Sequence, residues 1–422
     1  MVSNVRKFVI VTSWAMSERD YERFGCSYFE SKGYEIQVFD AMDICFPGVR
    51  ESIIQQNNSF RHTKKLDSWT ECENFFQKLQ EHDTIMLSIS FNKSTRPFFK
   101  ILKLCNAKVG WIQIGAFPPS VGSIRSFTQL TKIKSSILKI LIRVLKTKVI
   151  LFARQLANSF SSIGFNLRNP DFYLTSGPGA NLALPFIQSK YSILEGHSQD
   201  FEIAHTMQDK LENRYSNYAV FLDEYLPFHP DFIVEGSPPP IGQEKYFYLL
   251  NKFFTHVENQ FKLQVIIAAH PRADLKCYSR YFEGRSVIQS HTSELVKYSD
   301  LVIAHGSTSL SYAAIFRKRI SLITFEEFNN SNEGPFIHLM GNWIGEVPIL
   351  LNKMDKYCEV FNTLPDVKIE YLRRYELEFL SWKGVFERPL WDILKWQIDS
   401  RAEGNLIGIN HTAGKGERNE SK

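Results

Sequence analysis

Residues 7–40 read KFVIVTSWAMSERDYERFGCSYFESKGYEIQVFD, and this stretch decides the fold of the first half of the chain. Lys7–Thr12 is an apolar run that suits a strand buried on both faces. A helical stretch over roughly 17–32 follows, and Glu35–Asp40 has the pattern of a second strand. A strand, a helix and a strand in this order predict a βαβ unit with parallel strands.

The alternation of apolar runs and helical stretches continues and then restarts after Ser198. In the first half, further strands are predicted at 83–90, 108–114 and 171–175, with a helix at 96–105. In the second half, strands are predicted at 218–222, 263–269, 301–304 and 320–324, with helices near 243–260, 294–298 and 310–316. This pattern indicates two parallel sheets, each covered by helices on both faces.

The length agrees with this division, because 422 residues at ~150 per domain make two or three domains. We therefore predict an α/β chain with a first domain over 1–190 and a second over 191–365, which face a central crevice. Residues 366–401 are rich in Trp, Leu and Tyr, and we expect them to form helices that pack back on the body. The polar residues 402–422 are expected to form a disordered tail.

The net charge of +5 conceals a strong asymmetry along the chain. Residues 84–170 contain fourteen Lys and Arg but no Asp or Glu, so this block carries +14 and the other 335 residues carry −9. Apolar residues at 44% and charged residues at 23% are typical of soluble proteins, and a content of only 22 Gly and 17 Pro excludes collagen-like and linker-like chains. The basic block favours an anionic partner.

The cysteine pattern and the amino terminus bear on the compartment. The six cysteines form no C-x-x-C pair and no zinc-type spacing with histidine, so we expect reduced thiols, no metal and no cofactor. Residues 1–13 lack the features of a signal peptide, and no window reaches ~18 uncharged apolar residues. We expect a cytoplasmic protein whose membrane contact is peripheral.

Polar side chains follow three predicted strands of the second domain. They are, in chain order, Asp223-Glu224, His270-Pro271-Arg272 and His305-Gly306-Ser307-Thr308-Ser309. Ligands of open parallel sheets bind at the carboxyl ends of the strands, so these residues are expected to surround one crevice. The last segment precedes a helix, where hydroxyls and backbone N–H groups suit a phosphate. Taken singly, the segments also fit helix caps, a turn and a solvated corner.

Two further candidates lie where the domains join. Gly177 and Gly179 follow the strand at 171–175 and would let the backbone approach an anion or a sugar, or form a tight turn. His197 and Asp200 open the second domain and fit either a ligand contact or a hinge. The chain has no G-x-G-x-x-G, P-loop, G-x-S-x-G or H-E-x-x-H motif, which disfavours the enzyme classes that depend on them.

Residues 130–154 have the pattern of a cationic amphipathic helix. At 100° per residue, a sector of roughly 80° contains five basic side chains. They are Lys132, Lys139, Arg143, Lys146 and Arg154. Such a helix suits an anionic membrane surface, although an ordinary surface helix has the same pattern. Nucleic acid is disfavoured as a partner, because no recognised binding module accompanies the charge.

The predicted layout of two Rossmann-like domains, a terminal helical segment and a nucleotide-phosphate crevice in the second domain resembles GT-B glycosyltransferases. More narrowly, it resembles the bacterial sialyltransferases and polysialyltransferases, whose motifs are D/E-D/E-G, HP and a Ser/Thr cluster. The matching segments are Asp223-Glu224, His270-Pro271 and Ser307-Thr308-Ser309, with Tyr225 where the first motif has glycine. Residues 221–231 are also similar to a segment of bacterial surface-polysaccharide proteins.

This resemblance implies that Asp223 or Glu224 is the general base that deprotonates an acceptor hydroxyl. His270 would contact the donor phosphate, and Ser307, Thr308 and Ser309 would hold it. The implied reaction is transfer of a sugar, sialic acid-like and CMP-linked, to a capsule, lipopolysaccharide or other glycan, with no metal required. The alternatives are a polyol-phosphate transferase of the CDP-glycerol type and a non-catalytic nucleotide-sugar-binding protein.

Overall fold

The computed structural model describes residues 5–14, 16–52, 63–115, 118, 149, 152–153, 155–160, 162–186, 192–208, 215–229, 231–234, 236–331, 333–354, 361–385 and 388–402. The five basic residues of the predicted amphipathic helix, Lys132, Lys139, Arg143, Lys146 and Arg154, lie outside these ranges. The predicted tail lies outside them as well, apart from Ala402.

The first domain is built on a seven-stranded parallel sheet in the order β3-β2-β1-β4-β5-β6-β7. Its strands are β1 (Lys7–Thr12), β2 (Glu35–Asp40), β3 (Thr63–Lys65), β4 (Thr84–Ser88), β5 (Lys108–Gln113), β6 (Phe172–Thr175) and β7 (Ile193–Glu195). The predicted βαβ opening is present, since β1 pairs in parallel with β2 from Lys7–Glu35 to Thr12–Asp40. Because β7 pairs with β6, the first domain extends past residue 190.

The second domain is built on a six-stranded parallel sheet in the order β10-β9-β8-β11-β12-β13. Its strands are β8 (Tyr218–Leu222), β9 (Gln264–Ala269), β10 (Val287–Gln289), β11 (Leu301–Ala304), β12 (Ile320–Thr324) and β13 (Ile349–Leu350). The central strands are entirely buried, as their continuous apolar sequences require.

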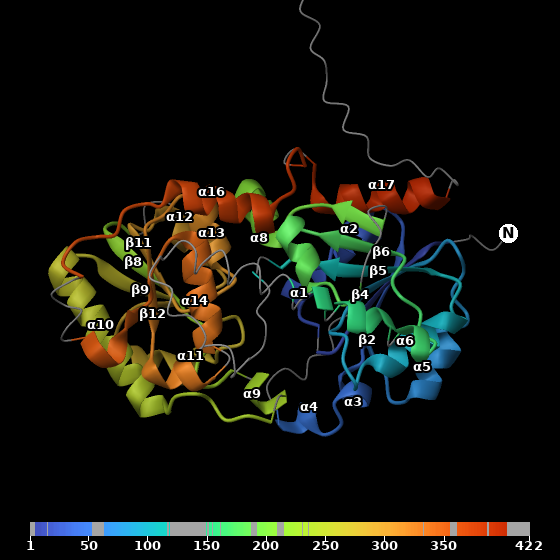
Figure 1. Ribbon diagram of the computed structural model, residues 1–422, viewed down its shortest axis with the longest axis horizontal. Coiled ribbons are helices and arrows are strands. Elements are labelled where there is room, and N and C mark those ends of the chain that lie inside the picture. The colour runs from blue at the N-terminus through green and yellow to red at the C-terminus, as the bar shows by residue number, and fades with distance from the viewer. Residues whose placement is uncertain are drawn as a thin grey trace, which may run out of the picture.

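Helices cover both faces of each sheet, as the alternating pattern predicts (Figure 1). Those before β7 are α1 (Glu18–Arg23), α2 (Cys26–Ser31), α3 (Met42–Cys45), α4 (Val49–Ser52), α5 (Trp69–Phe76), α6 (Arg96–Ile101) with η1 (Leu102–Leu104), and η2 (Pro178–Ala183). Those up to β11 are α8 (Gln199–Thr206), α9 (Asp231–Val234), α10 (Gln243–Phe261), α11 (Leu275–Tyr278), η4 (Ser279–Phe282) and α12 (Thr292–Tyr298). Those after β11 are α13 (Leu310–Ile315), η5 (Glu326–Asn330), α14 (Glu333–Ile344), η6 (Leu351–Lys353), α16 (Ile369–Tyr375), the π-helical turn η7 (Glu376–Leu380) and α17 (Leu390–Ala402).

The carboxyl-terminal helices return from the second domain to the first, which confirms that this part of the chain packs back on the body. α16 lies over the second domain, and α17 lies over the first beside α2 (Figure 1). Between them, η7 packs on η2, and the Ser176 hydroxyl donates to the Phe379 carbonyl at 2.7 Å. Leu390 and Leu394 are buried with Phe29 and Leu174 in the first core. The fold is thus two parallel-sheet α/β domains joined twice by the chain.

Among the described residues, no helix combines the length and the hydropathy needed to cross a membrane.

Candidate functional site

The carboxyl ends of β8, β9 and β11 lie side by side, because β8 is between the other two strands in the second sheet. Leu222 pairs with Ala268 on one side and with Ala304 on the other, so the three strands end at the same level. Asp223, Glu224, His270 and the loop 306–309 therefore emerge together from this edge. We call these residues the strand-end cluster.

Asp223 ties the ends of β8 and β9 together, and its side chain is only 5% exposed. Its Oδ1 accepts hydrogen bonds from the Tyr278 hydroxyl at 2.8 Å and from the Tyr225 N–H at 3.1 Å. Its Oδ2 accepts one from the His270 N–H at 3.2 Å. Burial raises the pKa of this carboxyl to about 6, and the three hydrogen bonds oppose the rise without cancelling it. Asp223 therefore titrates near neutral pH, but both its oxygens already have partners inside the domain.

Tyr225 adopts the backbone conformation that glycine would favour at this position of the motif. Its φ angle is 58°, in the left-handed region, which costs an L-residue roughly 1–2 kcal/mol. Asp223 accepts the hydrogen bond of its N–H, and its ring packs edge-on against Tyr278 with 4.9 Å between the centroids. These contacts offset the strain, so the turn after the acidic pair forms although the motif glycine is replaced.

Glu224 joins the ends of β8 and β11. Its Oε1 accepts a hydrogen bond from the Gly306 N–H at 2.7 Å, and its side chain is half-buried. Position 306 requires glycine because a Cβ there would lie 2.6 Å from the ring of Phe336 on α14. Glu224 is the more accessible carboxylate of the pair, and it is fixed against the loop that carries the hydroxyls.

His270 is a neutral hydrogen-bond donor. Its Nδ1 accepts a hydrogen bond from the Arg272 N–H at 3.2 Å, which assigns the ring proton to Nε2. Burial, together with electrostatic repulsion from His229, Arg272 and Arg19, lowers the pKa of His270 to about 3. A neutral N–H of this kind suits contact with a phosphate or a leaving oxygen, whereas its low basicity does not suit deprotonation of a hydroxyl.

Gln289 at the end of β10 fixes the loop that carries His270. The Gln289 amide donates to the carbonyls of His270, Pro271 and Ala273 over 2.9–3.1 Å. Pro271 and Arg272 are exposed beyond this anchor. The structure therefore places the predicted His-Pro-Arg segment beside the acidic pair, with Arg272 at its outer edge.

The loop residues 307–309 carry three hydroxyls, and all three residues are half-buried. The Ser307 Oγ accepts a hydrogen bond from the Ser309 N–H at 3.2 Å, and the Leu310 N–H bonds to the Ser307 carbonyl at 3.1 Å. α13 begins at Leu310, so the loop leads into a helix as the sequence predicts. The hydroxyl hydrogens are donors of the kind that phosphate oxygens accept.

His305 is not part of the cluster, although the sequence includes it among the phosphate-binding candidates. Its ring is fully buried, with Nδ1 at 2.9 Å from the Ile323 carbonyl and Nε2 at 3.2 Å from the Tyr246 hydroxyl. Burial lowers the pKa of His305 to about 4, which keeps the ring neutral. Both ring nitrogens serve the core, so we remove this residue from the proposed site.

The two glycines of the joining segment contact the chain itself. A Cβ at Gly177 would lie 2.4 Å from the Glu378 carbonyl oxygen, and one at Gly179 would lie 2.3 Å from the Phe379 ring. The absence of side chains at Gly177 and Gly179 thus lets η7 pack closely against this segment, between the two domains. We withdraw both glycines as ligand contacts for this reason.

His197 and Asp200 also hold structural elements together. The buried His197 Nε2 lies 3.0 Å from Glu202 Oε2 and from the Arg388 carbonyl. Burial lowers the pKa of His197, but these partners outweigh it and leave the pKa above its ordinary value. Asp200 at the start of α8 accepts a hydrogen bond from the Ser311 hydroxyl at 2.5 Å. The sequence allows either a ligand contact or a hinge for His197 and Asp200. The contacts of both residues are with the chain itself, as a hinge requires.

Arg19 is a candidate that the sequence does not single out. α1 meets the second domain where Arg23 Nε donates to Gln199 Oε1 at 2.6 Å, and Arg19 lies one turn earlier on the same face of α1. Its charge acts on His270 and interacts with Asp200. Within the described ranges, no hydrogen bond or ion pair holds its guanidinium. Chain order places α1 after the carboxyl end of β1, but no local pattern shows that α1 meets the second domain.

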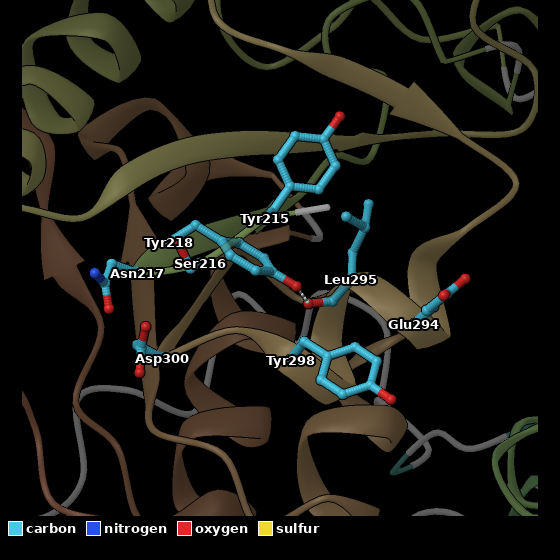
Figure 2. Close-up of a pocket in the computed structure, with 8 residues that line it drawn as sticks. All are labelled: Tyr215, Ser216, Asn217, Tyr218, Glu294, Leu295, Tyr298 and Asp300. Atoms are coloured by element: carbon cyan, nitrogen blue, oxygen red, sulfur yellow. Dashed lines mark hydrogen bonds between the residues drawn. The ribbon is translucent and has the colours of Figure 1, made fainter. Parts of the chain in front are cut away.

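A hollow of about 260 Å³ lies at the opposite edge of the second sheet, where β8 begins (Figure 2). The Tyr218 hydroxyl points across it to the Leu295 carbonyl at 2.7 Å. Its lining residues are Tyr215, Ser216, Asn217, Tyr218, Glu294, Leu295, Tyr298 and Asp300. Because the strands present their amino ends here, this hollow is separate from the strand-end cluster.

Among the residues that the structure describes, no group of three or more His, Cys, Asp or Glu is arranged to hold a metal ion.

No protein-family model matches the chain, and no curated protein matches its sequence. Among solved structures, the wall teichoic acid polymerase TagF is similar over 95% of this chain and 90% of its own, with 10% identity and a TM-score of 0.48. MnaA of S. aureus in complex with UDP is similar over 96% and 98%, with 11% identity and a TM-score of 0.47. MurG of Acinetobacter baumannii is similar over 94% and 99%, with 8% identity and a TM-score of 0.44. Similarity at this level assigns no activity, and the fold rests on the strand topology of the chain itself.

Proposed function

We propose that the chain is a glycosyltransferase that moves a sugar from a nucleotide-sugar donor to a bacterial surface glycan. The observation that carries the proposal is the strand-end cluster. It combines two carboxylates, a neutral imidazole N–H and three hydroxyls at the carboxyl edge of one parallel sheet. The sequence resemblance to bacterial sialyltransferases makes a CMP-linked, sialic acid-like sugar the donor class to test first.

In this reaction the acceptor hydroxyl oxygen attacks the anomeric carbon of the donor sugar. Glu224 takes the hydroxyl proton, and the bond between the anomeric carbon and the phosphate oxygen breaks. The electron pair leaves with the nucleotide phosphate, where negative charge develops. The His270 Nε2–H, the hydroxyls of the loop 307–309 and Arg272 are the donors that stabilise this charge.

Asp223 and Arg19 have supporting roles in this proposal. Asp223 links the end of β8 to the end of β9 through the His270 N–H and to α11 through the Tyr278 hydroxyl, and it accepts the Tyr225 N–H in the turn that follows it. We therefore assign Asp223 a positioning role and Glu224 the role of base. The charge of Arg19 acts on His270 from the first domain, and its guanidinium suits a donor carboxylate or phosphate. A donor that contacts both Arg19 and the strand-end cluster would be oriented by groups of both domains.

A polyol-phosphate transferase of the CDP-glycerol type is the second candidate. The observation that favours it is that both Asp223 oxygens already accept hydrogen bonds inside the domain. The groups that remain to contact a substrate are then mainly the phosphate-binding candidates, His270 and the loop 307–309. The acceptor oxygen would then attack phosphorus, and the product would contain a phosphodiester. A non-catalytic nucleotide-sugar-binding protein is the third candidate, and it would bind donors without turnover.

The test uses the purified full chain and a panel of CMP-, UDP-, GDP- and CDP-linked compounds. Thermal stabilisation identifies the donor, and mass spectrometry of the product of an acceptor reaction identifies the bond formed. We expect stabilisation by a nucleotide sugar and a glycosidic product. A phosphodiester product would exclude sugar transfer, and stabilisation without any product over a broad acceptor panel would favour the binding protein.

A further inference from the structure

His270 begins a tight turn at the carboxyl end of β9. The Ala273 N–H donates to the His270 carbonyl at 2.9 Å, which closes a four-residue turn with Pro271 at its second position, where proline is favoured. Inside the turn, the Arg272 N–H donates to His270 Nδ1 at 3.2 Å. The backbone of the turn therefore orients the side chain of its own first residue, and while this bond is present the ring proton is on Nε2.

Gln289 holds this turn from the neighbouring strand. β10 pairs in parallel with β9, and Gln289 is level with Ala269, the residue before His270. Its Nε2 donates to the carbonyls of His270, Pro271 and Ala273 at 2.9, 3.0 and 3.1 Å. One side-chain amide thus meets three carbonyls of the same turn.

The bond to the Pro271 carbonyl reaches the His270 ring through a single peptide group. The carbonyl of Pro271 and the N–H of Arg272 belong to the same peptide group, which is planar and trans, so the two bonds point to opposite sides. Gln289 Nε2 is the partner on one side at 3.0 Å, and His270 Nδ1 is the partner on the other at 3.2 Å. Rotation of this peptide group would break both hydrogen bonds together.

The amide of Gln289 is matched to the turn rather than to its own strand. Val287 and Ile288, which precede it in β10, are apolar, so the strand pattern does not call for an amide at this position. An amide has two N–H donors, whereas a glutamate carboxylate of the same shape has none and would place a negative charge against the carbonyl oxygens. An apolar side chain of similar size would remove this donor from the carbonyls, which is costly at a half-buried position.

The backbone is also strained directly after Gln289. Ser290 has a φ angle of 69°, in the left-handed region that serine rarely adopts. Such a conformation persists only where surrounding contacts hold it. The pairing with β9 and the three bonds of Gln289 are contacts that hold this end of β10. The chain is thus kept in an unfavourable conformation at the residue next to the amide that holds the turn.

We propose that Gln289 is a positioning residue, which acts through the peptide group between Pro271 and Arg272 to keep the ring of His270 oriented with its proton on Nε2. This inference deepens the proposed function and rests on it for the role of the His270 N–H, which is contact with the donor phosphate. The chain of hydrogen bonds from Gln289 to His270 does not depend on the reaction, so it can be tested without a substrate.

The first experiment records the ring-nitrogen NMR signals of the full chain, labelled at histidine, near neutral pH. His270→Gln identifies the signals of His270, and the test variant is Gln289→Ala. In the wild type we expect the Nε2–H form of His270 to dominate. In Gln289→Ala we expect the ratio of the Nε2–H form to the Nδ1–H form to fall about tenfold. Gln264→Ala, which removes an exposed side chain from the amino end of β9, is the matched control and should leave this ratio unchanged.

A second experiment separates positioning from a general loss of structure. With the donor identified from the panel, we expect the kcat of Gln289→Ala to fall about tenfold with the KM for the donor little changed, because the charge that His270 stabilises develops as the leaving group departs. Gln289→Ala added to His270→Gln should cause no further loss of kcat, since the residue through which it acts is then absent.

An unchanged ratio of the two ring forms in Gln289→Ala would overturn the proposal, and so would losses of kcat that multiply in the double variant. If Gln289→Ala does not fold, Gln289→Met provides the same comparison, because it fills the space of the amide without a donor. A wild type that transfers nothing, together with a ratio that responds to Gln289→Ala, would reject the proposed function and support the positioning of His270 by Gln289.

Discussion

The Tyr278 hydroxyl donates a hydrogen bond to Asp223 Oδ1 over 2.8 Å, and this bond joins α11 to the carboxyl end of β8. Both groups are buried, so water does not replace the bond when it is broken. Burial, followed by the charge of Asp223, raises the pKa of Tyr278 far above its ordinary value, which keeps the phenol a donor. The position of the acidic pair thus depends on a tyrosine more than fifty residues later.

Removing this hydroxyl tests that dependence. Tyr278→Phe leaves a buried carboxylate with one hydrogen bond fewer, so we expect the free energy of unfolding to fall by about 1.5–3 kcal/mol. Chemical denaturation measures the loss. Tyr248→Phe is the matched control, because this tyrosine is exposed on α10. Equal stability of the two variants would mean that the bond contributes nothing.

The raised pKa of Asp223 predicts a pH dependence of stability. The folded-state pKa of about 6 exceeds the ordinary value of 3.8, so the protonated carboxyl is favoured in the folded state. Its contribution is complete below the ordinary pKa and is lost as the pH rises through about 6. The wild type should therefore lose roughly 2–3 kcal/mol relative to Asp223→Asn between pH 4 and pH 7. Denaturation of both proteins across this range measures the difference, and a difference independent of pH would contradict the shift.

Glu224→Gln tests which carboxylate is the base. The amide keeps an oxygen that can accept from the Gly306 N–H but cannot take a proton, so we expect kcat to fall by roughly 10²–10⁴-fold. Donor affinity should change little, because the phosphate-binding groups are intact. Steady-state kinetics with the identified donor separate the two effects. A small loss of kcat in Glu224→Gln beside a large one in Asp223→Asn would reverse the assignment.

Arg19→Gln tests the contribution of the first domain to donor binding. Since no described residue pairs with this guanidinium, its removal should leave the melting temperature unchanged and weaken donor binding by about tenfold. Calorimetric titration of the donor measures the affinity. Arg373→Gln, at an exposed position of α16, is the control for loss of one positive charge. If both variants bind the donor as tightly as the wild type, Arg19 does not contact it.

Gly179→Ala tests the contact between η2 and η7. The added Cβ would lie 2.3 Å from Phe379 and 2.7 Å from Glu378 Cγ, so η7 must shift, at a cost of about 1–3 kcal/mol. Thermal denaturation detects this loss. Gly115→Ala should be nearly neutral, because no neighbouring atom lies within 4 Å of the Cβ position and its backbone is outside the left-handed region. A loss in Gly115→Ala as large as that in Gly179→Ala would argue against the packing explanation.

The sheets could be predicted from sequence because their central strands are continuous apolar runs. Predicted 218–222 and 301–304 coincide with β8 and β11, and the helix expected at 243–260 is α10. The edge strands β3, β7, β10 and β13 were not predicted. They have two or three residues each. Half-buried and exposed positions, such as the exposed Lys64 and Lys65, give no apolar pattern.

From the sequence, only those site residues that directly follow a predicted strand could be identified. Continuity of the chain places Asp223, Glu224 and His270 at one edge, but it does not say which imidazole faces inward. His270 and His305 both follow a buried strand, yet only the ring of His305 is enclosed by Tyr246 and Ile323. Arg19 was missed because its relation to the second domain depends on how α1 and α8 meet, which no local pattern encodes.

The return of the chain to the first domain has a consequence for synthesis on the ribosome. Leu390 and Leu394 are core residues of the first domain, but they are translated after the entire second sheet. While the second domain is translated and folds, the part of the first core that α17 covers therefore stays exposed. We expect the nascent first domain to expose Phe29 and Leu174 until α17 docks, so that α17 is the last structural element of the first domain to assemble.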